Sequence, residues 1–206
     1  MFYNFIWLVF GAIMRTVWGF RSHGRRNVPV EGGVVLALNH ASFFDPVAAG
    51  CGMLRPVHFF ARDTLFVGLF GVIISRLNAF PVKRDSPTGD VAAMKEYINR
   101  AKAGNVVLLF PEGTRTPDGR VKEAQPGVGM LAARAGVPVV PTYVKGSFQA
   151  WSRHRLVPGR GDMGIYYGKP FTVEKRAGET KKEQQERIRR TIQERLMALE
   201  AYCDSR

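Results

Sequence analysis

Short, unbroken apolar runs that alternate with stretches of helical periodicity constrain the fold of this 206-residue chain most strongly. Three such runs, at 34–39, 106–110 and 137–144, carry no charged residue and have the length of a strand. Runs of this kind are typical of strands that are buried on both faces, as in parallel sheets. We therefore predict a single α/β domain with a largely parallel or mixed central sheet flanked by helices.

Other segments extend this pattern. Further strands are expected at 57–61, at 79–82 (an edge strand, since it contains Pro81) and at 164–168. Helices are expected at 64–77, 90–105 and 127–136, and from Thr180, which forms a capping box with Glu183. The helix at 90–105 is expected to bury a face made of Val91, Met94, Ile98 and Ala101.

The N-terminal segment is apolar and rich in aromatic residues. Its first 14 residues carry no charge, but this run is shorter than the roughly 20 residues that a spanning helix needs. Aromatic residues, among them Trp7 and Trp18, suit a membrane–water interface, and the arginines that follow can bind anionic headgroups. We interpret residues 1–27 as an interfacial helical anchor that precedes the α/β domain of residues 28–206. The alternatives are a spanning helix with Arg15 at the interface and a buried core helix.

The charge balance favours anionic partners. The chain has 30 Lys and Arg residues against 17 Asp and Glu residues, a formal net charge of +13. Residues 145–160 hold four of these cations and no acid. Most aromatic residues lie in apolar runs rather than among the basic ones, so nucleic acid is not an expected partner. The two cysteines are far apart, which indicates a reducing, cytoplasmic setting and no structural metal.

A histidine and an aspartate, His40 and Asp45, follow the first apolar run. A carboxylate that accepts a hydrogen bond from one imidazole nitrogen leaves the other nitrogen free to take a proton. The two residues do not face each other on an ideal helix, so this pairing requires a distortion where the helix begins. In the alternative interpretation Asp45 is a cap or turn residue and His40 is a polar group at a strand end. Asn39 and Ser42 are expected to be scaffold residues or caps.

Two further turns follow strands and carry cations. "FPEGTR", residues 110–115, places an acid, a hydroxyl and a guanidinium together after a buried strand. Arginine suits bidentate binding of phosphate, and glycine allows a ligand to approach the backbone closely. "FPVKRD", residues 80–85, offers Lys83 and Arg84, either as phosphate ligands or as a solvated turn.

Together these motifs resemble a known family. The segments "NHASFFD", "AFPVKR", "FPEGTR" and "GVPVVP" occur in the order and approximate spacing of the four blocks of the glycerolipid acyltransferases. The chain is most similar to the 1-acyl-glycerol-3-phosphate acyltransferase (PlsC-type) family, over roughly residues 28–143. The resemblance implies acyl transfer from a thioester, acyl-coenzyme A or acyl carrier protein, to the hydroxyl of a lysophosphatidate-like acceptor, without a bound cofactor or metal.

The resemblance also implies roles for particular residues. His40 matches the general base and Asp45 the acid that orients it, and the nucleophile is the acceptor's own hydroxyl. Arg84 matches a phosphate-binding arginine. The block that holds the acceptor's glycerol phosphate matches Glu112, Gly113, Thr114 and Arg115. One departure is Gln125, which stands where family members often have lysine; Lys122 is a candidate to compensate, and the change suits a less charged or bulkier acceptor.

The expected partners are thus an anionic membrane surface, a lysophospholipid acceptor and the acyl donor. The expected location is the cytoplasmic face of the cytoplasmic membrane, as a peripheral or monotopic protein. Glycerol 3-phosphate, another lysophospholipid or a lyso-ornithine lipid are alternative acceptors. A hydrolase that uses the same His–Asp pair, and a non-catalytic basic module that binds membrane or nucleic acid, are the alternative functions.

Overall fold

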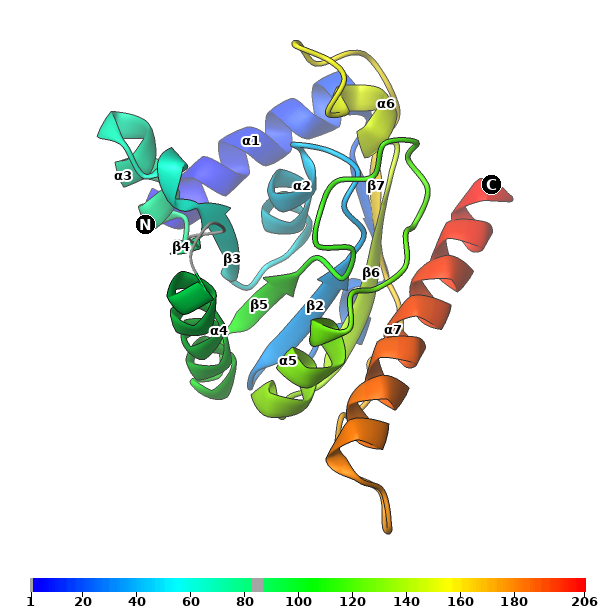
Figure 1. The fold of residues 1–206 in the computed structure, drawn as a ribbon. Helices are drawn as coiled ribbons and strands as arrows, with labels where there is room; N and C mark the ends of the chain where they lie inside the picture. Colours follow the sequence, from blue (N-terminus) through cyan, green and yellow to red (C-terminus); the bar gives the residue numbers. More distant parts are fainter. Residues whose placement is uncertain (1, 83–86) are drawn as a thin grey trace.

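A computed structural model describes residues 2–82 and 87–206 of the chain. Within this described part, seven strands form one sheet in the order β1-β7-β6-β2-β5-β3-β4 (Figure 1). Neighbouring strands are parallel except β6 and β7, which are antiparallel. The strands are β1 (Arg21–His23), β2 (Val34–Leu38), β3 (Val57–Arg62), β4 (Ala79–Val82), β5 (Val106–Leu109), β6 (Val139–Lys145) and β7 (Gly164–Tyr167).

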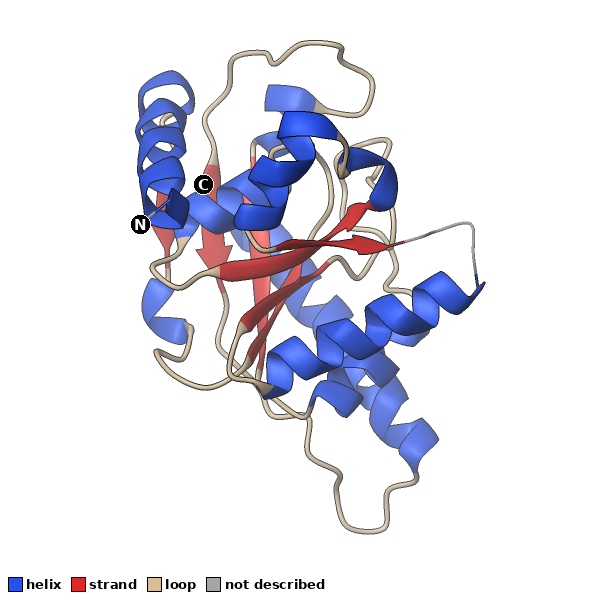
Figure 2. Ribbon diagram, turned by 90° about the vertical axis from the view of Figure 1, so that its left-hand side faces the viewer, coloured by secondary structure: helices blue, strands red, loops and turns tan. Residues whose placement is uncertain are grey.

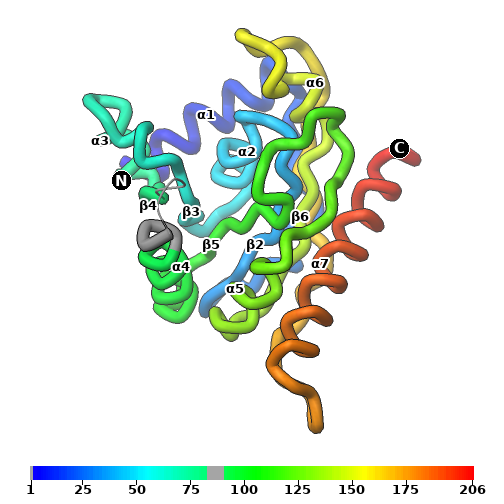
Figure 3. The backbone as a smooth tube through the Cα atoms, in the orientation of Figure 1, coloured from blue at the N-terminus to red at the C-terminus, as the bar shows by residue number. Residues whose placement is uncertain are grey.

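Helices cover both faces of the sheet, as the side view shows (Figure 2). The α-helices, which Figure 3 labels along the backbone, are α1 (Phe2–Trp18), α2 (Asp45–Gly52), α3 (Gly68–Arg76), α4 (Pro87–Lys102), α5 (Gly127–Ala135), α6 (Ser147–Trp151) and α7 (Lys181–Asp204). Two 3-10 turns are η1 (Arg25–Asn27) and η2 (Asp63–Leu65). The predicted α/β domain with a mixed sheet is confirmed, including an N-terminal helix.

Strand β2 shows why the central strands are apolar throughout. Successive strand residues point to opposite faces of a sheet. Leu36 and Leu38 join a cluster with residues of α1 and α2, whereas Val35 and Ala37 join a second cluster with residues of α4, α5 and α7. All five β2 residues are 0% exposed, so neither face of the strand can carry a polar side chain.

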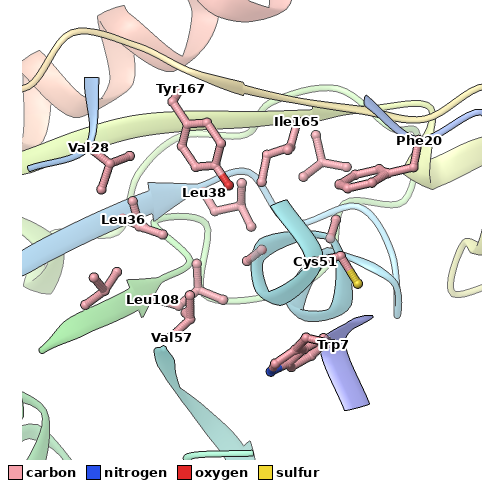
Figure 4. Close-up of a cluster of buried hydrophobic side chains, with 14 of the residues drawn as sticks. Trp7, Phe20, Val28, Leu36, Leu38, Cys51, Val57, Leu108, Ile165 and Tyr167 are labelled. Carbon is pink, nitrogen blue, oxygen red and sulfur yellow. The ribbon is translucent and has the colours of Figure 1, made fainter. Parts of the chain in front are cut away.

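Helix α1 packs against the domain through one face. Trp7 and Met14 are buried in the cluster on the α2 side of the sheet, and Figure 4 shows Trp7 beside α2, near Cys51. A Cβ atom at Gly50 would lie 2.5 Å from the Trp7 ring, so glycine is required for this approach. The expectation that Trp7 lies at a membrane interface is therefore wrong, because its ring fills the core.

The opposite face of α1 is apolar and exposed. Arg76 at the end of α3 lies over the ring of Phe2, 5.7 Å from its centroid, which places α3 beside the N-terminal end of α1 (Figure 1). We call the exposed side chains the apolar surface of α1 and α3: Phe2, Phe5, Leu8, Val9, Phe10, Ile13, Val17, Leu69, Phe70 and Val72. No helix in the described part of the chain is long and apolar enough to cross a membrane.

Several elements differ in detail from their sequence patterns. The helix expected at 64–77 begins only at Gly68, because η2 precedes it. In α4, Ala101 of the predicted stripe is buried, and Met94 and Ile98 are partly buried against the core, but Val91 is 65% exposed. Ala93 and Tyr97 complete the buried face, so the prediction is correct except at Val91. Strand β1 was not expected, since its three residues carry no apolar pattern; pairing with β7 alone defines it.

The C-terminal helix agrees with its sequence signals. Thr180 and Glu183 form the predicted capping box at the start of α7. Ile188, Ile192 and Leu196 are 0% exposed and pack on the sheet face that α4 and α5 also cover.

Candidate active site

The candidate site lies where β2 and β5 end. These neighbouring strands run parallel, with Ala37 opposite Leu109, so the segments that follow them emerge at the same edge of the sheet. The backbone N–H of His40 donates to Glu112 Oε1 at 2.8 Å, and the N–H of Thr116 donates to the His40 carbonyl at 2.8 Å. Two motifs that are 72 residues apart are thereby joined on both sides of His40.

His40 and Asp45 form a hydrogen-bonded pair. The distance between His40 Nδ1 and Asp45 Oδ2 is 2.9 Å. Asp45 is the first residue of α2 and is 0% exposed, and its Oδ2 also accepts the backbone N–H groups of Ala41 and Ser42, each at 2.7 Å. These bonds fold residues 40–44 back over the start of the helix, which is the distortion that the five-residue spacing requires.

The imidazole of His40 is held at both its edge and its face. The Phe110 ring stacks on it, with centroids 3.9 Å apart and an interplanar angle of 22°. The hydrogen bond to Asp45 assigns the proton of the neutral ring to Nδ1. Nε2 makes no hydrogen bond to any residue that the structure describes, and the side chain is 16% exposed. The pair therefore presents an unprotonated nitrogen toward a site that solvent can reach.

Glu112 holds the backbone of His40. It is 3% exposed, and burial raises the pKa of its carboxyl group to about 7, with the nearby Asp45 adding to the rise and the His40 N–H opposing it. The sequence suggested an acceptor ligand here; the one Glu112 oxygen described as bonded, Oε1, is bonded to the protein backbone.

Replacing Glu112 by glutamine is expected to change how stability depends on pH. Because burial raises this pKa from 4.5 to about 7, the wild-type protein loses stability as the pH rises from about 4.5 through about 7. The loss reaches up to about 3 kcal/mol above pH 7. Glutamine keeps an oxygen for the His40 N–H but cannot ionise. The free energy of unfolding of both proteins is measured with denaturant at several pH values. The value for the variant minus that for the wild type should rise as the pH rises, and a difference that stays constant would contradict the prediction.

The rest of the "FPEGTR" turn is positioned by glycine and by a ring. Gly113 has φ +69°, and it and Thr114 are exposed. The Arg115 guanidinium lies over the Phe43 ring, 3.7 Å from its centroid. Gln125 packs beside Gly113, and its backbone N–H donates to the Pro111 carbonyl at 2.8 Å. Arg84 and its neighbour Lys83 lie outside the described residues.

Of the two roles expected for Asn39 and Ser42, scaffold or cap, the structure shows the scaffold role, and neither residue caps α2. Asn39 bonds across to β6, where its Oδ1 accepts the Val144 N–H at 2.7 Å, because β2 ends there and β6 continues. Ser42 is 0% exposed, and its hydroxyl donates to the Trp151 carbonyl at 2.7 Å. The helix has no side-chain cap. In the turn before it, the Asp45 carboxylate accepts the N–H groups of Ala41 and Ser42, and the Ser42 hydroxyl oxygen accepts the Phe44 N–H at 3.0 Å.

The cysteines are poor nucleophiles. Burial raises the pKa of Cys51 to about 12 and that of Cys203 to about 11, so both are thiols at neutral pH. Among the described residues, no group of three or more His, Cys, Asp or Glu side chains could hold a metal ion.

Sequence reasoning missed Phe110 and Thr116 as parts of the site. Phe110 is the first residue of the "FPEGTR" segment, and an aromatic residue directly before the turn was the available signal. Thr116 acts through its backbone N–H, which leaves no trace in residue type.

The fold and this edge define an α/β enzyme whose histidine is held by a buried carboxylate. The chain belongs to the Acyltransferase family, whose family model matches residues 19–145, and is therefore an acyltransferase. This match confirms the resemblance that the four motifs suggested.

Similar proteins carry related names. A 1-acyl-sn-glycerol-3-phosphate acyltransferase of Bacillus subtilis (strain 168) is 26% identical over 98% of both chains. One from Pseudomonas aeruginosa is 29% identical over 82% of this chain and 64% of its own. A chloroplastic enzyme of Brassica napus is 31% identical over 66% of this chain, which spans 40% of that relative. The crystal structure of the 1-acyl-sn-glycerophosphate acyltransferase PlsC from Thermotoga maritima has the same fold, with a TM-score of 0.76 and 24% sequence identity. The match covers 93% of this chain and 77% of the Thermotoga chain.

Proposed function

We propose that this protein transfers an acyl chain from a thioester donor to the free hydroxyl of 1-acylglycerol 3-phosphate. The observation that carries the proposal is the His40–Asp45 pair: Nδ1 is bonded to a buried carboxylate, Nε2 is bonded to no residue that the structure describes, and the His40 side chain is 16% exposed. The name of the Bacillus subtilis relative, which matches over 98% of both chains, supports the choice of acceptor.

The proposed reaction needs no nucleophile from the enzyme. His40 Nε2 takes the proton of the acceptor hydroxyl while the hydroxyl oxygen attacks the carbonyl carbon of the thioester. The C–S bond then breaks, and the imidazolium returns the proton to the leaving thiolate. The negative charge of Asp45 stabilises the imidazolium between these steps. The burial of Ser42 and the raised thiol pKa values of both cysteines support a mechanism without an enzyme-bound acyl group.

The acceptor's phosphate requires cations near His40. Arg115 is the described cation of the "FPEGTR" turn, and its position over Phe43, three residues from His40 along the chain, supports a role as phosphate ligand. Arg84 is proposed for the same role from the resemblance alone. Glu112 we assign to positioning His40, since its bonded oxygen is engaged by the His40 N–H.

The location of the acceptor agrees with the apolar surface of α1 and α3. Ten large apolar side chains face outward there, and such a surface suits the boundary between headgroups and acyl chains. We propose that residues 1–27 dock the protein on the membrane while residues 28–206 carry the chemistry. The cytoplasmic face of the membrane, with acyl-coenzyme A or acyl carrier protein as donor and without a cofactor, completes the proposal.

An acceptor panel tests this function. Purified protein is incubated with radiolabelled acyl-coenzyme A or acyl carrier protein and with 1-acylglycerol 3-phosphate, glycerol 3-phosphate, other lysophospholipids or a lyso-ornithine lipid. Labelled phosphatidate should be the main product. Labelled free fatty acid would indicate a hydrolase, and preference for another acceptor would overturn the choice of substrate.

Replacing Arg115 by lysine should weaken acceptor use. Lysine keeps the charge but loses the planar pair of donors, so kcat/KM for 1-acylglycerol 3-phosphate should fall by about 10- to 100-fold, mainly through KM. Steady-state kinetics at varied acceptor concentration measure this. Arg134→Lys, at an exposed position of α5, is the matched control. An unchanged KM for the acceptor in the Arg115 variant would remove this residue from the phosphate site.

A further inference from the structure

The loop that follows α6 combines positive charge with an exposed apolar tip. We call residues 152–160 the arginine loop. Leu156 is 97% exposed and Val157 is 72% exposed. Arg153, Arg155 and Arg160 are also exposed, and no acidic residue occurs between positions 145 and 161. Two adjacent large apolar side chains that are mostly exposed to water, with three cations around them, make this loop a candidate contact surface.

The arginine loop is fixed to the end of α1. The Trp18 indole N–H donates to the Gly159 carbonyl at 2.7 Å, and the Gly159 N–H donates to the Ala150 carbonyl at 2.6 Å. Trp18 also packs against Phe44, with ring centroids 4.8 Å apart. Figure 1 shows the loop beside the C-terminal end of α1, while α3 lies near the other end. The exposed tip therefore lies beside α1, the helix that carries most of the apolar surface.

The same loop also contacts the candidate active site. Trp151, just before it, accepts the Ser42 hydroxyl through its carbonyl, and Arg153 Nη1 lies 3.5 Å from the Arg115 carbonyl. His154 Nε2 lies 3.1 Å from the Pro117 carbonyl. The arginine loop thus connects the helix proposed to lie on the membrane with the turn proposed to bind the acceptor.

We infer that the arginine loop is a second membrane-contacting element, specific for an anionic lipid surface. Leu156 and Val157 enter the boundary between headgroups and acyl chains, and Arg155 and Arg160 bind lipid phosphates beside them. Charge complementarity favours an anionic partner, and the link to α1 favours the membrane over an acidic protein such as an acyl carrier. This inference rests on the proposed function, because it extends the membrane docking of residues 1–27.

A fluorescent label at the tip tests insertion. Leu156→Cys is labelled with an environment-sensitive dye; the native cysteines, Cys51 and Cys203, are buried and should not react. Vesicles that contain phosphatidylglycerol should shift the emission to shorter wavelength, and vesicles of pure phosphatidylcholine should do so much less. Met197→Cys, at an exposed position of α7, is the matched control and should show no shift with either vesicle.

Charge removal tests lipid specificity. Each arginine near an anionic leaflet contributes about fivefold to binding, so Arg155→Gln/Arg160→Gln should bind phosphatidylglycerol vesicles roughly 30-fold more weakly in co-sedimentation. Lys102→Gln/Arg134→Gln removes the same charge from exposed positions elsewhere and should bind like the wild type.

The outcomes separate this inference from the proposed function. If the wild type binds vesicles but the label at position 156 does not respond, the arginine loop makes no membrane contact while the proposed docking stands. If the wild type binds no vesicle, the proposed docking itself fails, and this inference fails with it. If the Arg155→Gln/Arg160→Gln variant binds vesicles like the wild type but reacts more slowly only with acyl carrier protein as donor, the partner is an acidic protein and the inference is wrong.

Discussion

Replacing His40 by alanine should lower kcat/KM for acyl transfer by on the order of 10²–10⁴-fold, the usual cost of removing a general base. The ring is fixed by Asp45 at its Nδ1 edge and by Phe110 on its face, and Nε2 is the nitrogen left to take the hydroxyl proton. His40 acts on the reaction only in the transition state, where it takes the proton. The variant should therefore have a lower kcat, while the KM for the acceptor changes little. Transfer of a radiolabelled acyl chain to 1-acylglycerol 3-phosphate measures it.

The matched control is His23→Ala. His23 stacks on Tyr166 at the β1 edge of the sheet, with centroids 4.5 Å apart, and it should be dispensable for activity. Unfolding curves of both variants separate a loss of chemistry from a loss of fold. A His40→Ala protein that is folded and as active as the wild type would show that another group accepts the proton.

The second large effect is expected from Asp45→Asn. Asp45 Oδ2 accepts three hydrogen bonds, from His40 Nδ1 and from the N–H groups of Ala41 and Ser42. An amide oxygen in the same place can accept all three, so the turn should keep its shape. The negative charge is lost, however, and the imidazolium is no longer stabilised. Activity should therefore fall by on the order of 10²–10⁴-fold with the loop intact.

Asp45→Ala supplies the comparison. It removes the charge and all three hydrogen bonds, each worth on the order of 1–3 kcal/mol for a charged acceptor, so it should also lower the free energy of unfolding. Asp45→Asn should lower activity about as much with a smaller loss of stability. Equal destabilisation of the two variants would mean that the amide does not preserve the turn, and wild-type activity of Asp45→Asn would show that the charge is unnecessary.

Much of the fold could be predicted from local sequence patterns. The unbroken apolar runs at 34–38 and 106–109 became the central strands because both of their faces are covered by helices. The capping box at Thr180 and the glycine that ends α5, Gly136 with φ +66°, are local features that a few neighbouring residues determine. His40 and Asp45 could be paired as candidates because only five residues separate them.

The remainder depended on contacts between distant segments. The spacing of His40 and Asp45 did not show that Phe110 stacks on the imidazole or that Glu112 holds its backbone; the parallel register of β2 and β5 brings these residues together. Trp7 lies in a segment with the composition of an interfacial helix, but a glycine at position 50 allows its ring into the core. Residue types and local spacing thus determined the central strands, the capping box of α7 and the chemical groups. The tertiary structure decided which of those groups meet and which nitrogen of His40 is left open, because both depend on strand register and on packing between residues far apart in the chain.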